Sequence, residues 1–209
     1  MKDLIIVGAG GFGREVYGYA LSCIENGANW RVKGFLDDNP NALNPYNYPL
    51  GIIGSISEWR PSAGELYIMG LGAPKEKKRI AEFLMSRGAE FTTLIHPLAY
   101  IGRNVKMGKA CIICPFCVLN CDLELGDFVT VNTNSALGHD ARIGSWCTLS
   151  SHSDITGRVS LGEGVFFSSS VTTVPSAKIG DWCNVGINSS VIGRIKPNTK
   201  VFGNPASEI

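Results

Sequence analysis

The sequence has almost no excess charge and no long apolar run. Across its 209 residues, 19 basic side chains stand against 18 acidic ones, and the formal net charge is +1. A charge this balanced argues against nucleic acid as a partner. The apolar run Leu4–Val7 near the N-terminus is far shorter than the ~20 residues of a membrane span. We therefore expect no secretory signal, no membrane span and a cytoplasmic location.

Paired metal-ligand motifs are also missing. Cys114 and Cys117 form a CxxC spacing, which shares Cys114 with the overlapping CxxC of Cys111 and Cys114, but no separate CxxC pair lies elsewhere in the sequence, which has only 3 histidines. A structural zinc site needs four ligands, usually as two such pairs. We therefore expect no metal.

A six-residue repeat runs from Ile95 to Phe202. Written in sixes without a gap, this stretch gives eighteen hexads. The first position is aliphatic, Met or Phe in all but two hexads, which begin with Thr173 and Pro197. The fifth is small or Val except at Leu123 and Ile195, and the second is often Gly. A six-residue period fits neither a helix nor an ordinary amphipathic strand, and it is typical of a parallel β-helix.

Each hexad is interpreted as a short strand followed by a corner, with three hexads to a coil and six coils in all. First-position side chains then point inward and stack along the axis, and the narrow fifth position takes small groups. Glycine at the corners is expected to supply backbone angles closed to other residues. Cysteines fill four of the fifth positions as small apolar groups, namely Cys111, Cys117, Cys147 and Cys183.

Ahead of the repeat, strand patterns alternate with helix patterns. Strands are expected at 3–8, 31–38, 65–72 and 89–95, and helices at 14–26 and from Pro74 onward, with a Pro- and Asn-rich loop at 39–54. Such alternation predicts a small parallel α/β sheet, a Rossmann-like half domain. We therefore divide the chain into domains at 1–94 and 95–209.

A glycine-rich turn, Gly8–Gly13, follows the first strand, and Asp37 follows the second. This order satisfies the dinucleotide fingerprint. The domain lacks room for the second mononucleotide half, so NAD is disfavoured. A nucleotide-sugar fits better, with its pyrophosphate at the helix N-terminus and Asp37 or Asp38 on the base or ribose. A turn kept for packing alone is the remaining alternative.

The whole chain resembles the hexapeptide-repeat acetyltransferases that modify nucleotide-linked amino sugars or sialic acids for bacterial surface glycans. The resemblance is carried by GAGGFGRE at 8–15, FLDD at 35–38, GLGAPKEKKR at 70–79, GHD at 138–140 and GNPA at 203–206. It implies a left-handed β-helix, acetyl-CoA as co-substrate, and a homotrimer with active sites between chains. Exposed aromatic side chains, expected at Phe116, Phe128, Trp146 and Trp182, would be covered in that trimer.

The resemblance also implies site residues in the first domain. These are the nucleotide-binding residues Gly11, Phe12, Gly13, Asp37, Asp38 and Gly70. Several members that act on UDP-amino sugars have histidine where this chain has Phe12. Phe12 cannot make that polar contact, which leaves the acceptor sugar open.

His139 is the candidate general base, because the family places its base at the histidine of this triplet. At the third hexad position it should project outward, and a neutral imidazole suits removal of a proton from an acceptor amine or hydroxyl. Asp140 could orient it, provided that the chain turns a corner there. His96, before Pro97, is expected to be structural.

Acetyl-CoA contacts are implied at Thr148, His152, Ser169 and Ile187, and His152 could equally line the acceptor pocket or be solvated. The leading function is N-acetylation of a nucleotide-linked, UDP-type amino sugar by direct transfer. The alternatives are O-acetylation of a sialic acid or another sugar hydroxyl, and a non-catalytic nucleotide-binding scaffold.

Overall fold

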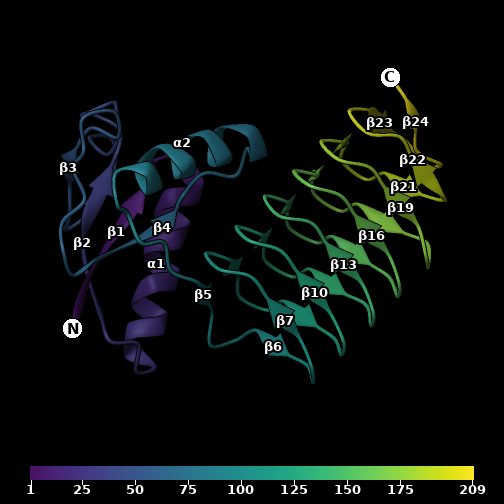
Figure 1. Cartoon of the computed structure of the whole chain (residues 1–209), viewed down its shortest axis with the longest axis horizontal. Coiled ribbons are helices and arrows are strands. Elements are labelled where there is room, and N and C mark those ends of the chain that lie inside the picture. Colours follow the sequence, from purple (N-terminus) through teal and green to yellow (C-terminus); the bar gives the residue numbers. More distant parts are fainter. The chain divides into compact units, whose positions relative to one another are not determined.

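The computed structural model describes all 209 residues as two compact units, residues 1–97 and 98–209. The first unit is an α/β domain and the second is a solenoid of short strands (Figure 1). The chain contains no helix long and apolar enough to cross a membrane.

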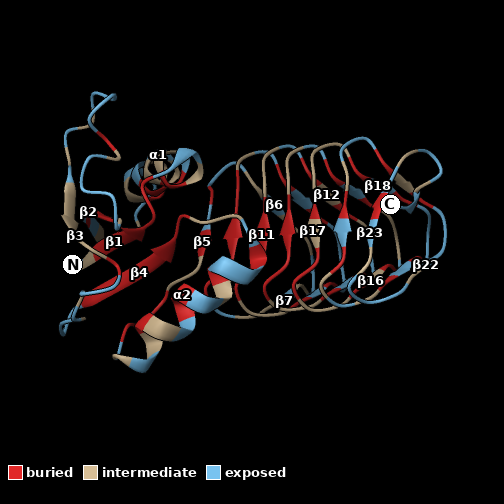
Figure 2. Cartoon of the chain, turned by 90° about the horizontal axis from the view of Figure 1, so that it is seen from above, coloured by how far each residue is buried: buried red, intermediate tan, exposed pale blue.

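The first unit is a four-stranded sheet with two long helices. In chain order its elements are β1 Lys2–Val7, α1 Gly11–Glu25, β2 Trp30–Leu36, β3 Ile52–Gly54, β4 Glu65–Met69, α2 Pro74–Ser86 and β5 Leu94–Ile95. The sheet order is β3-β2-β1-β4, and every pairing is parallel. The predicted Rossmann-like half domain is confirmed. Its central strand β1 is fully buried over Leu4–Val7 (Figure 2), as parallel sheets with covered faces require.

Two sequence predictions in this unit were wrong. The segment 39–54, expected to be a loop, ends in β3, which pairs with β2 from Phe35 onward. Gly34 allows this, because a Cβ there would lie 2.5 Å from Cγ2 of Ile53. The expected strand 89–95 is reduced to one bridge, between Phe91 and Tyr67, and the two-residue β5.

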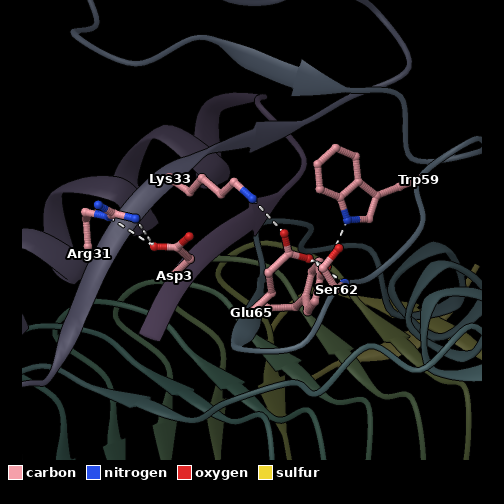
Figure 3. A network of polar contacts seen from close by, with 7 residues as sticks. Asp3, Arg31, Lys33, Trp59, Ser62 and Glu65 are labelled. Atoms are coloured by element: carbon pink, nitrogen blue, oxygen red, sulfur yellow. Dashed lines mark hydrogen bonds and ion pairs between the residues drawn. The ribbon is translucent and has the colours of Figure 1, made fainter. Parts of the chain in front are cut away.

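A buried polar network ties β2 and β4 to the segment before β4 (Figure 3). Glu65, 6% exposed, accepts hydrogen bonds from Lys33 Nζ at 2.7 Å, from the Ser62 N–H at 2.9 Å and from the Tyr67 hydroxyl. The Trp59 indole N–H in turn donates to the Tyr67 hydroxyl at 2.8 Å. Burial raises the pKa of Glu65, but these hydrogen bonds outweigh it and hold the pKa below its usual value.

The second unit winds through three sheets, here called faces. The first face has β6 Tyr100–Ile101, β9 Val118–Leu119, β12 Ala136–Leu137, β15 Asp154–Ile155, β18 Thr172–Thr173 and β21 Ser190–Val191. The second face has β7 Lys106–Met107, β10 Glu124–Leu125, β13 Arg142–Ile143, β16 Ser160–Leu161, β19 Lys178–Ile179 and β22 Arg194–Ile195. The third face has β8 Ile112–Ile113, β11 Thr130–Val131, β14 Thr148–Leu149, β17 Phe166–Phe167, β20 Asn184–Val185, β23 Lys200–Phe202 and the antiparallel β24 Ser207–Glu208.

Strands stack in parallel on strands one coil away, for example Thr130 on Thr148. First-position side chains such as Leu137 and Leu149 are fully buried, and so are the fifth-position cysteines Cys111, Cys117 and Cys147, with Cys183 at 1% exposure. The predicted parallel solenoid with a stacked aliphatic core is therefore confirmed. All seven cysteines are free thiols.

The predicted role of glycine was wrong. The left-handed backbone conformation falls on the fourth hexad position and is adopted mostly by other residues, such as Asp140 at φ 60° and His152 at φ 61°. Second-position glycines are needed for another reason. A Cβ on Gly126 would lie 2.6 Å from the backbone nitrogen of Ser145, in the next coil. Close stacking of coils, and not an unusual φ, selects glycine there.

The gap-free register of eighteen hexads was also wrong near the C-terminal end. Lys178 pairs with Arg194 and Asn184 with Lys200, so the repeat there is two residues shorter than in the earlier coils. The corner before Arg194 has lost two residues. The shift moves Ile195 to a first position and Pro197 into a corner, which removes two apparent exceptions to the pattern.

Two of the four aromatic residues expected on the surface are buried. Phe128 is 1% exposed and Trp146 is 8% exposed. Their rings stack on each other with centroids 4.3 Å apart and planes inclined by 13°. They occupy fourth positions one coil apart, so stacking along the axis covers part of each ring. Phe116 remains exposed, and Trp182 is half-buried.

Candidate active site

The solenoid has three rows of corners, and two of them carry candidate residues. The His139 corner, between the first and second faces, stacks Arg103–Asn104, Cys121–Asp122, His139–Asp140, Gly157–Arg158 and Pro175–Ser176. The His152 corner, between the third and first faces, stacks Pro115–Phe116, Thr133–Asn134, Ser151–His152, Ser169–Ser170 and Ile187–Asn188.

His139 and Asp140 form a histidine–carboxylate pair. Nδ1 of His139 lies 2.7 Å from Oδ2 of Asp140, and both side chains are about half exposed. The left-handed conformation of Asp140 turns the chain, so neighbours that would diverge in a strand come together here. A carboxylate can only accept, so Nδ1 carries the proton and Nε2 keeps its lone pair.

Gly157 makes room for the imidazole ring. It stands one coil beyond His139, and a Cβ on it would lie 2.6 Å from Nε2. Nε2, the nitrogen with the lone pair, therefore lies over the backbone of Gly157 near the protein surface. Any side chain at position 157 would occupy that space.

A second carboxylate lies one coil before Asp140. Asp122 accepts a hydrogen bond from the Asn104 side-chain amide at 2.9 Å. This bond and one from Cys121 lower the pKa of Asp122, and His139 adds a smaller contribution of the same sign. Two acidic groups, Asp140 and Asp122, thus lie near His139.

The implied acetyl-CoA residues lie elsewhere on the solenoid. His152, Ser169 and Ile187 share the His152 corner, one coil apart from each other, and Ile187 is 53% exposed. In one chain this corner is separated from His139 by a whole face. Thr148 belongs to the third face and is only 4% exposed, which argues against its direct contact with acetyl-CoA.

The glycines near the start of α1 in the first unit differ in exposure, since some are open to solvent and others are packed. Gly10 and Gly11 are exposed at the start of α1, and no side chain caps that helix end. Gly13 and Gly70 are buried against each other, because a Cβ on Gly70 would lie 2.7 Å from Cα of Gly13. Gly70 and Gly13 therefore act in helix–strand packing. Phe12 is half-buried between the open and packed glycines.

The two aspartates also differ in what they can offer a ligand. Asp37 accepts from the Ala9 N–H at 2.8 Å and from the Asn39 N–H at 2.9 Å, one on each carboxylate oxygen. It thus fastens the glycine turn to the end of β2. Asp38 is exposed, and Ser55 and Ser57 hold only its Oδ1. The Ser55 hydroxyl and then the Ser57 N–H lower the pKa of Asp38.

Several residues of both sites were missed from the sequence. Gly157 and Asp122 could be found only by stacking the hexads in threes, since each lies one coil from the His139 pair. Ser55 and Ser57 are far from Asp38 along the chain and carry no motif. His96 is 6% exposed and packs edge-on against Tyr19 with ring centroids 5.7 Å apart, in line with its expected structural role.

The fold defines a class of protein, namely a Rossmann-like α/β domain followed by a hexapeptide-repeat solenoid. Residues 3–84 match the family described as the PglD N-terminal domain. No curated protein matches the sequence. The resemblance to hexapeptide-repeat sugar acetyltransferases is confirmed in the fold of the whole chain.

Several solved structures match the chain along its full length. WeeI from Acinetobacter baumannii AYE shares 19% identity at a TM-score of 0.88, with 100% of both chains covered. The acetyltransferase domain of PglB from Neisseria gonorrhoeae FA1090, in complex with acetyl coenzyme A, shares 22% at 0.88, covering 100% of this chain and 99% of that one. PerB from Caulobacter crescentus, in complex with CoA and GDP-perosamine, shares 22% at 0.88, covering 100% and 98%.

The donor set gives no sign of a metal centre. No group of three or more His, Cys, Asp or Glu side chains is placed to hold a metal ion. Burial raises the pKa of the Cys117 thiol to about 11, so it stays protonated and is a poor metal ligand.

Proposed function

We propose that this protein is an acetyl-CoA-dependent N-acetyltransferase that acts on a nucleotide-linked amino sugar, in cytoplasmic steps of surface-glycan synthesis. The observation that carries the proposal is the His139–Asp140 pair on an exposed solenoid corner, with Nε2 held over Gly157. A non-catalytic scaffold has no use for an imidazole fixed in this way. The fold shared with structures that hold acetyl-CoA, or CoA with GDP-perosamine, supports the same reaction class.

In the proposed reaction, His139 Nε2 accepts a proton from the acceptor amine as that amine attacks the acetyl thioester. The new N–C bond forms while the C–S bond breaks, and CoA leaves as a thiolate that takes up the proton from the His139 imidazolium to give the thiol. Asp140 stabilises the imidazolium that results, since its carboxylate faces Nδ1. Transfer is direct, without an acetyl-enzyme, so both substrates are bound at once. Two structures of histidine variants of the perosamine N-acetyltransferase, each with CoA and GDP-perosamine, have the same overall fold.

The nucleotide end of the acceptor is assigned to the first unit. Gly10 and Gly11 at the start of α1 present backbone N–H groups and the positive end of a helix dipole, which suit a diphosphate. Asp38 keeps one carboxylate oxygen for a ribose or base, whereas Asp37 is already engaged by backbone. We assign a UDP-type sugar as the substrate.

Product analysis tests the proposal. The protein is incubated with acetyl-CoA and UDP-, GDP- or dTDP-linked amino sugars, and free thiol release is followed. We expect thiol release with an amino sugar and an alkali-stable amide product. An alkali-labile ester would favour the O-acetyltransferase alternative on a sialic acid or other hydroxyl. No thiol release with any acceptor, while nucleotide binding persists, would favour the scaffold. Calorimetry that shows tight NAD binding and no UDP-sugar binding would refute the substrate assignment.

A further inference from the structure

The second face changes its charge pattern toward the C-terminal end. Its outward column reads Lys106, Glu124, Arg142, Ser160, Lys178 and Arg194, each stacked on the next. In the first coils the charges alternate and pair, with Lys106 3.4 Å and Arg142 3.6 Å from Glu124. In the last coils Lys178 and Arg194 are neighbours of like charge, both exposed, and neither forms an ion pair.

Both cations line a pocket of about 280 Å³. Ser160, Lys178 and Arg194 line it with polar side chains, and Gly162 and Gly180 are also among its lining residues. The two-residue shortening of the preceding corner is what sets Arg194 beside Lys178.

Asp181 is the one acid that lines the pocket, and its Oδ1 already accepts the Glu163 N–H at 2.8 Å. The lining therefore carries two cations against one engaged carboxylate. Like charges on adjacent strands repel, and a bound dianion would relieve that repulsion. Lys as a point charge and Arg as a planar fork are the side chains that recognise phosphate.

We propose that this pocket binds a phosphate-bearing ligand, for which the nucleotide end of CoA is the source that the proposed function supplies. The identification of CoA as the ligand rests on the proposed function. The second face begins at the His139 corner, and Lys178 and Arg194 stand two and three strands beyond Arg142. At about 4.8 Å per strand, the cations lie about 10–14 Å along the axis from the His139 coil. An extended ligand could reach both places.

Equilibrium binding to the full chain tests the proposal with four probes: CoA, dephospho-CoA, adenosine 3′,5′-bisphosphate and inorganic phosphate. Lys178→Ala and Arg194→Ala should each raise the Kd of CoA and of adenosine 3′,5′-bisphosphate by about tenfold. Lys106→Ala is the matched control, because it removes a lysine of the same column far from the pocket and should leave both Kd values unchanged. Thermal melting checks that all variants fold.

The outcomes separate the sources of phosphate. A smaller loss for dephospho-CoA than for CoA would place the 3′-phosphate at the cations. Weakened binding of inorganic phosphate with CoA unaffected would support a phosphate site filled by a free ligand. Equal affinities of wild type and both variants for all four probes would overturn the proposal. Phosphate-dependent binding without acetyl transfer to any amino sugar would leave the pocket standing and refute the proposed function.

Discussion

At the scale of single residues, His139 has one ring nitrogen engaged and one free. Asp140 holds Nδ1, and Nε2 lies over Gly157, in the space that a side chain at position 157 would fill. His139→Ala should therefore lower kcat by about 10²–10⁴-fold, since it removes the proton acceptor, while the affinity for acetyl-CoA stays near wild type. Asp140→Asn should cost less, because it weakens the imidazolium and leaves the base in place. Steady-state kinetics measures both effects.

The pH profile gives the second readout for His139. The wild-type rate should fall as acid protonates the imidazole, because a protonated ring cannot accept another proton. His139→Ala should lose that acid limb, and His152→Ala should keep it. If His139→Ala retains more than about a tenth of wild-type kcat, below the usual general-base effect, the assignment is wrong and His152 becomes the first candidate.

Glu65 shows how a buried charge depends on its partners. Glu65→Gln should lower the free energy of unfolding by about 1–3 kcal/mol near neutral pH, because the amide N–H groups would face Lys33 without an acceptor. The folded pKa of Glu65 lies below its ordinary value. Its contribution to stability is thus present above the ordinary carboxyl pKa and is lost as the pH falls through the folded value.

Urea unfolding at several pH values checks this prediction. The difference between wild type and Glu65→Gln should shrink as the pH falls. Glu90→Gln is the control, since Glu90 forms an exposed pair with Lys2 at 3.4 Å, and exposed pairs contribute little. A loss in Glu90→Gln equal to that of Glu65→Gln would contradict the argument from burial.

At the scale of the elements, stability of the solenoid depends on close contact between coils. Gly126→Ala should lower the free energy of unfolding by about 1–3 kcal/mol, because its Cβ would lie 2.6 Å from the Ser145 backbone nitrogen. Gly51→Ala is a matched control, since a Cβ there meets nothing within 4 Å. Chemical denaturation compares the two. Equal stability of both variants would show that coil spacing adjusts freely, against the packing argument.

The sequence predicted structure best where the same position of every repeat lies in the same environment. Stacked first-position aliphatics and small fifth-position residues marked the solenoid because the core repeats. The shortened corner before Arg194 stayed hidden, since Val, Ile, Gly and Arg also fit the hexad pattern. Burial of Phe128 and Trp146 could not be predicted either, because it depends on how rings stack across coils. For the site, His139 was recognisable from its triplet, but Gly157 and Asp122 required the coil geometry.

At the scale of the whole molecule, one chain does not bring its candidate residues together. His139 lies on one corner, whereas Ser169 and Ile187 lie on another. Exposed apolar side chains also remain on the first coils, with Phe116 at 58%, Tyr100 at 61% and Val118 at 38% exposure. Apolar groups gathered in this way need cover. A homotrimer would meet both requirements, with a site built from the His139 corner of one chain and the His152 corner of the next.

Complementation between two inactive variants tests this arrangement. Alone, His139→Ala lacks the base and Ile187→Asp disturbs the other corner, so each should have little activity. In trimers mixed at random in equal amounts, about a quarter of the sites would combine an intact His139 with an intact Ile187 from different chains, given closed threefold symmetry. We therefore expect co-expression to restore about a quarter of wild-type activity, and sedimentation to show a trimer at micromolar concentration. Mixed trimers without restored activity would mean that each site lies within one chain, and a monomer would refute the trimer.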